Sequence, residues 1–560
     1  MERILRLFGK EYGNLNQAAI LLGSFTFLSQ ILGLFRDRAI AHFIGPSLDL
    51  DIYYAAFRIP DFIFLSFASL FSITVLIPFI LDKMKGSQSV TKDAIDFINN
   101  VFSFFILLLF VVSVFAFFLM PYLVKFITPG FNSLAQTKIV LMSQIMLLSP
   151  VFLGLSNLFG SITQLFKKFF IYSLSPIFYN LGIILGIVFL YPVFGIFGLA
   201  IGVVGGAILH FLIQFLSSQT SGFKTSFIYN ISFKEIKNVV AISLPRTLGL
   251  SINNIVLIII VSIASFLPFG SISVYNLSLN IQNVPLSIIG LSYAVAAFPN
   301  MSRFFKNGDL DSFKNNLIQG ARQIIFWSLP IAFLFIVLRA QIVRVILGTP
   351  TFSWDNTRLV AASLALFSIS IVAQSLIALF ARAYYAGGNT KKPLYINLIS
   401  ATLIIIFAKV LIFVFNTNQT FRFFIEHILK VDSISGTGIL MLPFAYSLGT
   451  IINFILLWYF IKKDFMQGRH FILESFLQSL TASFALGLVT YFALNAFSPI
   501  FVTETFFGIF LQGLLAGICG ILAGAVVFYI FKNEEFLSLI RTLRTKFWKN
   551  KVLPPSEENI

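Results

Sequence analysis

Five of the charged side chains in a largely apolar stretch near the N-terminus could act together. They are Arg36 and Asp37 in the motif GLFRDRA, and Asp51, Arg58 and Asp61 in the motif DLDIYYAAFRIPD. An arginine guanidinium can donate two parallel hydrogen bonds to a phosphate, and a nearby carboxylate can neutralise it. Two interpretations stay open: a network of ion pairs that clamps a kinked hairpin, or the cationic wall of a cavity that binds an anion.

A second polar stretch carries amides rather than charges. Asn276, Asn280 and Asn283 are spaced i, i+4 and i+7, which places them on one face of a helix. Such amides either form hydrogen bonds between helices or line a wet cavity that suits sugars, and the sequence favours neither. Arg246 and Asn253 lie in the preceding apolar segment, and Arg246 is the candidate anion contact of this half.

The elements that must position these residues are membrane-spanning helices. The chain has 560 residues, of which 58% are hydrophobic and 11% charged, and its mean hydropathy is +0.92. A soluble protein carries roughly 25% charged residues, so most of the surface of this chain must face lipid. This composition excludes a soluble enzyme, a nucleic-acid-binding module and a disordered chain.

About fourteen apolar stretches are long enough for a helix to cross a bilayer. They lie near 15–44, 50–82, 98–124, 136–164, 171–193, 194–217, 238–266, 271–300, 317–346, 357–385, 393–416, 437–461, 473–497 and 505–531. We therefore predict an all-α polytopic membrane protein. Pro60 and Pro285 are expected to break their helices, because proline lacks the N–H that a helix interior needs.

The basic residues indicate how the chain is oriented. Most of the 39 Lys and Arg residues fall in alternate segments that include both termini, and cytoplasmic segments are the ones enriched in these residues. This pattern predicts an even number of spans with both ends in the cytoplasm. The net charge of +17 is thus a topology signal and not a sign of nucleic-acid binding.

The chain also resembles itself at a shift of about 220 residues, as expected for a parallel repeat. LSQILGL at 28–34, for example, matches LPRTLGL at 244–250. We predict an N-terminal six-helix bundle at 15–217, a C-terminal six-helix bundle at 238–461 and two additional transmembrane helices at 473–531. A cytoplasmic interfacial segment is expected at 1–14 and a cytoplasmic amphipathic tail at 532–560. Two parallel bundles favour a transporter that exposes a central site to each side in turn.

The sequence runs typical of enzymes are missing. There is no HExxH, GxSxG or phosphate-binding GxxxxGKS/T motif, the single Cys519 excludes a disulfide framework, and the histidines lack metal-ligand spacing. We expect no catalytic residue, metal or cofactor, and transport driven by the membrane potential or by a monovalent cation. A membrane-embedded glycosyl- or acyltransferase, with His42 near Asp49, is an alternative from another class.

Two motifs resemble a known family. LSQILGLFRDRAIAHFIGPSLDLDIYYAAFRIPDF at 28–62 and ARAYYAGGNTKKP at 381–393 are similar to the MurJ (MviN) lipid II flippases of the multidrug/oligosaccharidyl-lipid/polysaccharide exporter superfamily. The resemblance implies a protein of the bacterial cytoplasmic (inner) membrane that flips an undecaprenyl-diphosphate-linked peptidoglycan precursor, lipid II, to the outer leaflet by alternating access. The implied partners are this polyprenyl-diphosphate lipid, membrane lipids and cell-wall synthesis proteins.

The resemblance also implies roles for particular residues. Arg36 would contact the diphosphate, Asp37 would pair with a cation as the cavity opens and closes, and Asp51 would lie near the outer gate. The predicted substrate-binding residues are Arg36, Asp37, Arg58, Arg246 and Asn280, and the predicted gating or cavity residues are Asp51, Asp61, Asn253, Asn276 and Asn283.

The chain departs from the family pattern at several cavity positions. Family members usually carry arginine where this chain has Gln30, Phe64 and Asn280, and Glu-Gly where it has Ser69 and Leu70. Several cavity charges of the family are therefore absent. A related exporter of another polyprenyl-diphosphate-linked glycan, or of an amphipathic solute, is the alternative function.

Overall fold

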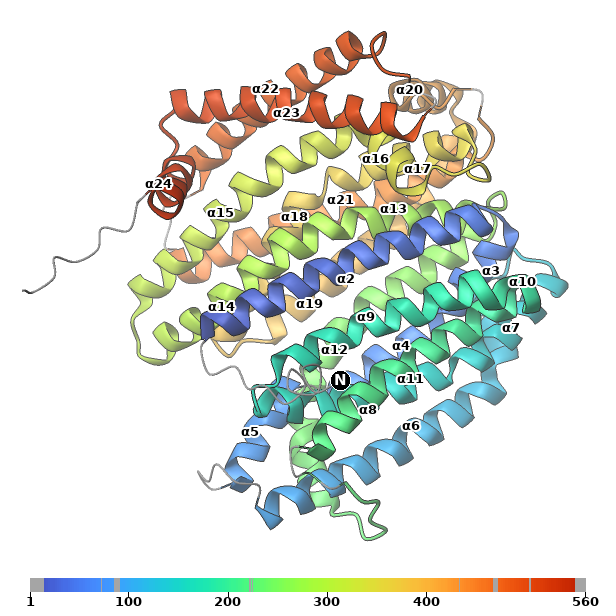
Figure 1. The fold of residues 1–560 in the computed structure, drawn as a ribbon, viewed down its shortest axis with the longest axis vertical. Helices are drawn as coiled ribbons and strands as arrows, with labels where there is room; N and C mark the ends of the chain where they lie inside the picture. The colour runs from blue at the N-terminus through green and yellow to red at the C-terminus, as the bar shows by residue number, and fades with distance from the viewer. Residues whose placement is uncertain are drawn as a thin grey trace, which may run out of the picture. The chain divides into compact units, whose positions relative to one another are not determined.

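The structure of the chain is a computed structural model that describes residues 15–71, 73–84, 91–220, 223, 225–432, 434–466, 472–502 and 505–548. Within these residues every regular element is a helix and no strand is present (Figure 1). The all-α prediction is therefore confirmed for this part of the chain. The predicted interfacial segment at 1–14 and the end of the predicted tail after residue 548 lie outside the described residues.

The chain is a multi-span membrane protein. Among the described residues, 11 helical stretches are long and apolar enough to cross a membrane, or up to 12 if two helices bent by 44° form one span. The stretches are α6 (Lys92–Ile127), α7 (Ser133–Met146) with α8 (Leu148–Leu165), α9 (Phe169–Leu185) with α10 (Tyr191–Phe194), α11 (Ile196–Thr220), α12 (Phe233–Ala264), α13 (Ser271–Pro285) with α14 (Ser292–Lys306), α15 (Leu310–Val337), α19 (Lys391–Thr417), α21 (Met441–Ile461), α22 (Leu473–Phe497) and α23 (Phe506–Ile530), and the bent pair is α17 (Trp354–Ser368) with α18 (Ile371–Ala386). The predicted count of fourteen is not confirmed.

The charged hairpin accounts for the two predicted spans, at 15–44 and 50–82, that are not among these stretches. The first forms one helix, α2 (Leu15–Phe43), and carries charges in its C-terminal part. The second is divided into α3 (Leu48–Ala56), α4 (Arg58–Phe67), η1 (Ala68–Phe71) and α5 (Ile73–Met84). Charges and helix breaks distinguish this segment from a continuous apolar span.

Of the two prolines expected to break their helices, Pro60 lies beside a break, whereas the helix continues past Pro285 as a π-helical turn. Pro60 lies in the first turn of α4, just after the break at Phe57, where its missing N–H leaves no intrahelical hydrogen bond unmade. Pro285 is the last residue of α13, and the π-helical turn η3 (Leu286–Leu291) follows it. The break before Pro60 and the π-helical turn after Pro285 both lie close to the polar residues that the sequence predicts to be functional.

The chain divides into two compact units. The first comprises Met1–Val284, Ile346–Phe367 and Asn389–Asn453, and the second comprises Pro285–Val345, Ser368–Gly388 and Phe454–Ile560. These boundaries differ from those of the predicted bundles at 15–217 and 238–461, which remain a prediction.

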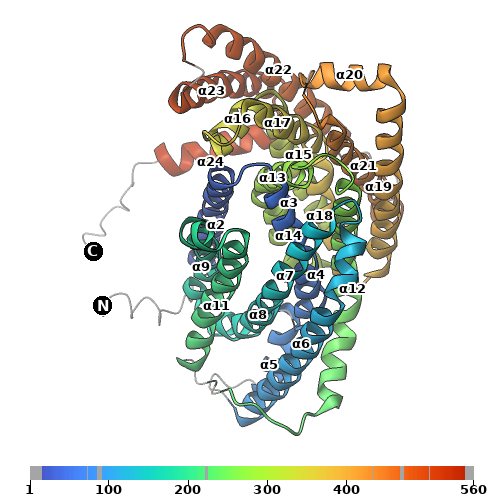
Figure 2. The same cartoon turned by 90° about the vertical axis from the view of Figure 1, so that its right-hand side faces the viewer.

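In the first unit, α9 is held between α2 and α11 (Figures 1 and 2). The contact with α11 depends on small residues, because a Cβ at Gly182 would lie 2.3 Å from the Cα of Gly206. Close backbone approach through glycines is typical of helices that pack inside a membrane. This packing fixes the face of α9 that reaches α2.

In the second unit, α15 packs against α14, α18 and α22, and α22 pairs with α23. The C-terminal helix α24 (Glu534–Trp548) lays Phe536 and Leu539 against the buried side chains of Phe326 and Phe528. Part of the apolar face of the predicted amphipathic tail therefore contacts protein rather than lipid.

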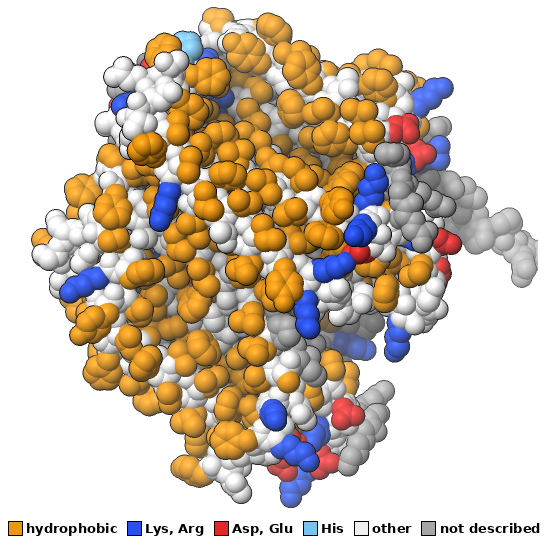
Figure 3. All heavy atoms as spheres, turned by 180° about the vertical axis from the view of Figure 1, so that it is seen from behind, with side chains coloured by type: hydrophobic (Ala, Val, Ile, Leu, Met, Phe, Trp, Pro, Cys, Tyr) orange, Lys and Arg blue, Asp and Glu red, His pale blue; other side chains and the backbone are white. Residues whose placement is uncertain are grey.

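Hydrophobic side chains predominate on the surface drawn in Figure 3. On α6, the side chains of Phe110, Phe115 and Phe118 are 61%, 68% and 72% exposed. Contiguous apolar surface of this kind is unfavourable in water, whereas acyl chains solvate it without cost. These side chains therefore face the lipid of the bilayer.

Candidate functional site

The charged hairpin meets the amide-bearing helix α13 in the first unit. Ser273, Asn276 and Asn280 lie at i, i+3 and i+7 of α13, and each hydrogen-bonds a charged residue of α3, α4 or α2. Of the two interpretations of this face, hydrogen bonds between helices are therefore confirmed for Asn276 and Asn280. The face is the element around which the candidate site is built.

Asp51 is the most completely satisfied of these charges. Its Oδ1 accepts hydrogen bonds from the backbone N–H of Ser273 at 2.7 Å and from the Ser273 hydroxyl at 2.5 Å, and its Oδ2 accepts one from the Gly270 N–H at 2.7 Å. Only 1% of the residue is exposed. The free N–H groups and positive dipole end of a helix N-terminus stabilise a carboxylate there. In this structure the predicted gate residue joins α3 to the start of α13.

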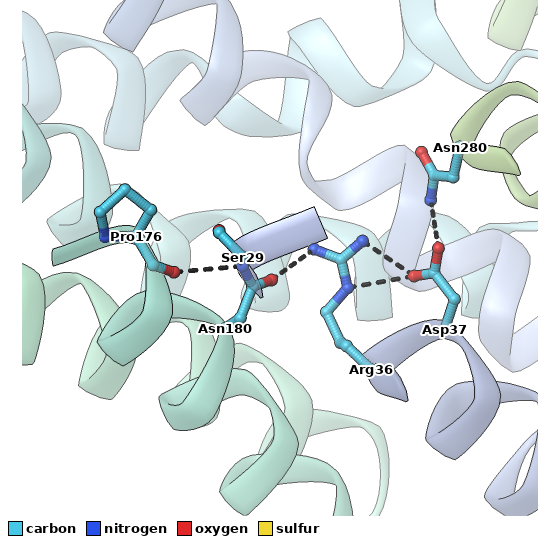
Figure 4. Close-up of polar contacts among 6 residues, drawn as sticks. All are labelled: Ser29, Arg36, Asp37, Pro176, Asn180 and Asn280. Atoms are coloured by element: carbon cyan, nitrogen blue, oxygen red, sulfur yellow. Dashed lines mark hydrogen bonds and ion pairs between the residues drawn. The ribbon is translucent and has the colours of Figure 1, made fainter. Parts of the chain in front are cut away.

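Arg36 and Asp37 form a chain of polar contacts across three helices (Figure 4). The Nε and Nη2 of Arg36 donate to Oδ1 of Asp37 at 3.0 and 2.8 Å, and its Nη1 donates to Oδ1 of Asn180 at 3.2 Å. The Nδ2 of Asn280 donates to the other oxygen of Asp37 at 3.1 Å. The guanidinium thus links α2 to α9, and the carboxylate links α2 to α13.

The charged groups in this chain of contacts are hydrogen-bonded, but the Arg36 side chain is still partly exposed. The side chain of Arg36 is 23% exposed, whereas that of Asp37 is 2% exposed. Asn180 is held in place by its own donations to the Pro176 carbonyl at 3.1 Å and to the Ser29 hydroxyl at 3.5 Å. The cation is therefore neutralised by its neighbour and still reachable, which suits a site where an incoming anion competes with an internal carboxylate.

Arg58 is buried with few partners. Only 9% of the residue is exposed, its Nη2 donates to Oδ1 of Asn276, and its Nε is buried without any acceptor. The hydroxyls of Tyr54 and Tyr275, which interact electrostatically with Arg58, are likewise buried without a hydrogen-bond partner. Among the described ion pairs none includes Arg58. A buried cation with so few acceptors is costly inside a membrane.

The remaining predicted residues are Asp61, Asn283, Asn253 and Arg246. Asp61 is half-buried on α4 and interacts electrostatically with Arg58, but its carboxylate has no hydrogen bond to any described residue. Asn283 is half-buried on α13, about one turn beyond the amides described above. Asn253 is exposed on α12. Arg246 also belongs to α12, and its side chain lies outside the described part of the chain.

Sequence reasoning missed several partners of the site, among them Ser273, which holds Asp51. Asn180 was detectable as a lone amide in the otherwise apolar α9, where a polar side chain needs a partner. Ser66 and Ser251 form a hydroxyl pair at 2.9 Å that joins α4 to α12. Serine is common in membrane helices, where it often bonds its own backbone, so the sequence alone carried no signal for this pair.

Comparison with solved structures shows which fold the chain has. The fold matches a structure described as lipid II flippase MurJ in an inward closed conformation, with a TM-score of 0.71 and 23% identity over 93% of this chain and 100% of that one. It also matches an inward-facing multidrug resistance MATE family transporter, with a TM-score of 0.61 and 13% identity over 78% of this chain and 95% of that one. The chain therefore shares the fold of these two transporters.

Sequence comparison shows to which protein family the chain belongs. The family model for lipid II flippase MurJ matches residues 40–512. A probable lipid II flippase MurJ of Rickettsia prowazekii is 27% identical over 444 residues, which cover 78% of this chain and 83% of the relative. A lipid II flippase MurJ of Burkholderia cenocepacia is 27% identical over 394 residues, which cover 68% and 75%. The chain belongs to the MurJ family of lipid II flippases, which confirms the predicted resemblance and the prediction of a transporter rather than an enzyme.

Proposed function

We propose that this chain flips lipid II from the inner to the outer leaflet of the bacterial cytoplasmic membrane by alternating access, with both termini in the cytoplasm. Membership of the MurJ family is the observation that carries this proposal. The substrate combines a prenyl tail that can stay in lipid with a diphosphate that cannot. A diphosphate that crosses a membrane needs cations along its route, and the first unit supplies them.

The diphosphate would first compete for Arg36. A guanidinium offers phosphate oxygens the same fork of N–H groups that Asp37 now occupies through Nε and Nη2. Exchange at these two donors would free the Asp37 carboxylate, which keeps its hydrogen bond from Asn280. Without substrate, the Asp37 carboxylate would occupy these two donors, and an incoming anion would replace it.

Arg58 would supply a second cation for the headgroup. Its Nε and the hydroxyls of Tyr54 and Tyr275 are donors without acceptors, and a phosphate oxygen is an acceptor without donors. A rearrangement that opens the space around α4 and α13 would satisfy both. The wild-type burial of Arg58 is consistent with a side chain that is retained for substrate rather than for stability.

The other predicted residues complete the proposal. We assign Asp61, Asn253, Asn283 and Arg246 to the polar surface that the headgroup passes. Transport would be driven by the membrane potential or by a monovalent cation, and cell-wall synthesis proteins that use lipid II would be its partners. The comparisons with known proteins do not favour another lipid-linked glycan or an amphipathic solute.

The test is complementation of a bacterium depleted of its own lipid II flippase. The wild-type chain should restore growth, and Arg36→Ala should lower flipping by roughly ten- to a hundredfold, the value of a charge-assisted contact. Arg36→Lys keeps the charge but loses the fork, so its activity should be intermediate. Arg303→Ala, which removes an exposed arginine at the end of α14, is the matched control and should behave as wild type.

The outcomes separate the function from the site. Failure of the wild-type chain, at a membrane level that immunoblotting shows to be normal, would overturn the assignment of lipid II. Full growth with Arg36→Ala would leave the function standing and remove Arg36 from the site.

A further inference from the structure

A short helix lies across the end of a membrane span in the first unit. α20 (Gln419–Leu429) follows α19 after a break at Asn418, whose side chain caps the new helix by accepting from the Phe421 N–H at 3.0 Å. Lys430 ends the helix with a left-handed φ of 59°. Figure 2 shows α20 turned across the end of α19 instead of continuing along it. Because α19 spans the membrane, a helix across its end runs along the membrane surface.

The apolar residues of α20 include a buried pair, an exposed pair on the neighbouring face, and Phe423, which is 65% exposed and stacks on His427. Ile425 and Leu429 are buried against the protein, each 9% exposed. Phe424 and Ile428 are 57% and 56% exposed and lie on the neighbouring face, about 100° around the helix. An amphipathic helix docked only on protein needs one apolar face, so the second face requires a different apolar environment.

The charged groups around α20 are of both signs, and Asp432 lies 3.7 Å from the His427 ring nitrogen. Glu426 is already neutralised, since it accepts from Arg422 at 3.0 Å and from the Thr437 hydroxyl at 2.5 Å. The exposed side chain of Lys430 has no acidic partner among the described residues. Arg358 of α17 donates to the Lys430 carbonyl at 2.8 Å and so fixes the C-terminal end of α20. Basic groups beside an exposed apolar face are complementary to lipid phosphates above acyl chains.

We propose that α20 is an interfacial helix that binds the headgroup–acyl boundary of the bilayer. Phe424 and Ile428 enter the upper acyl region, and Lys430 reaches the phosphates. The predicted topology places this surface on the outer side of the membrane. The helix thereby holds the ends of α17, α19 and α21 at one depth, independently of which substrate the chain carries.

The test places a fluorescent label on each face of α20 in the full-length chain. Cys519→Ala removes the single native thiol, and Phe424→Cys then carries an environment-sensitive fluorophore. His427→Cys is the matched control, because the native side chain is 72% exposed and lies on another side of the same helix. Both proteins are reconstituted in vesicles of phosphatidylethanolamine and phosphatidylglycerol, with either a lipid carrying a shallow spin label or aqueous iodide as quencher.

The two labels should respond in opposite ways. We expect the spin-labelled lipid to quench the label at 424 at least about threefold more strongly than the label at 427, and iodide to show the reverse order. Equal access of iodide to both positions would overturn the proposal. So would protection of position 424 from both quenchers together with disulfide formation between Phe424→Cys chains, because a second copy would then cover this face. Ile428→Cys repeats the measurement at a second position on the apolar face.

Discussion

Asp51 and Arg58 come from the same hairpin and contact the same helix, yet their surroundings are opposite. Three hydrogen bonds from the start of α13 saturate the Asp51 carboxylate. Arg58 contacts α13 one turn further along, at Asn276, which is its single acceptor, and its Nε is buried without a partner. A satisfied charge inside a membrane stabilises the fold, whereas an unsatisfied one lowers stability and persists only for another reason.

Arg36 lies between these extremes. It is fully paired, like Asp51, but its partners are side chains of α2 and α9 that can rearrange, and 23% of it is exposed. The comparison therefore assigns the three charges different roles. Asp51 stabilises the fold, Arg36 forms an ion pair that an anion can exchange, and Arg58 is a buried cation available to the substrate. Substitutions can test each role, because the three make different predictions for stability and for transport.

The largest effect on stability is expected for Asp51→Ala. The substitution leaves the N–H groups of Gly270 and Ser273 and the Ser273 hydroxyl buried without an acceptor, at a cost of roughly 3–5 kcal/mol. We expect a large drop in the thermal unfolding midpoint of the detergent-purified protein and a low level in the membrane. Flipping per folded molecule should fall much less than the protein level does.

Asp51→Asn is the matched control, since it keeps one acceptor oxygen and the size of the side chain. It should lose about 1–2 kcal/mol, part of which is the favourable interaction with the helix N-terminus. If Asp51→Ala instead folded normally and lost only transport, Asp51 would act on the substrate or on a gate. The distinction between a structural Asp51 and a functional Arg58 would then be wrong.

Arg58→Gln should have the opposite signature. The glutamine amide can still donate to Asn276, while the buried charge disappears, so the unfolding midpoint should stay the same or rise. Transport should fall by roughly tenfold or more, because the diphosphate loses a cation. Flipping is measured with proteoliposomes and a labelled lipid diphosphate, normalised to folded protein.

A lowered midpoint together with normal transport would show that Arg58 stabilises the fold. That result would overturn the different roles assigned to Asp51 and Arg58. Equal losses of both would mean that the hydrogen bond to Asn276, rather than the charge, is what the substitution disturbs.

Much of the fold could be predicted because lipid makes the sequence simple to interpret. A helix that crosses a bilayer must satisfy its backbone internally, so long apolar runs predicted helices with few alternatives. The count of spans was harder to predict in the charged hairpin. Between 50 and 82, hydropathy predicted one span, but the helix is interrupted after Ala56 and again at η1. Hydropathy averages over such breaks and cannot locate them.

The site was predictable in composition but not in its pairing. Spacing placed Asn276 and Asn280 on one face, and that face does receive the charges of the hairpin. Which charge meets which amide depends on how the helices are rotated about their axes, and a single sequence does not fix that rotation. For this reason the contact of Arg36 with Asn180 was missed, and the exposed Asn253 was grouped with residues that it does not contact.

The smallest effect is expected for Asn280→Ala. The substitution removes one hydrogen bond to Asp37, made at 3.1 Å, and leaves the ion pair with Arg36 intact, so the cost should be about 1 kcal/mol. Asn253→Ala, which removes an exposed amide of helix α12, should leave the unfolding midpoint unchanged. Both are compared by unfolding midpoint and by flipping rate. If Asn280→Ala abolished flipping while the fold stayed intact, Asn280 would contact the headgroup directly, and the site would extend along α13 beyond the two arginines.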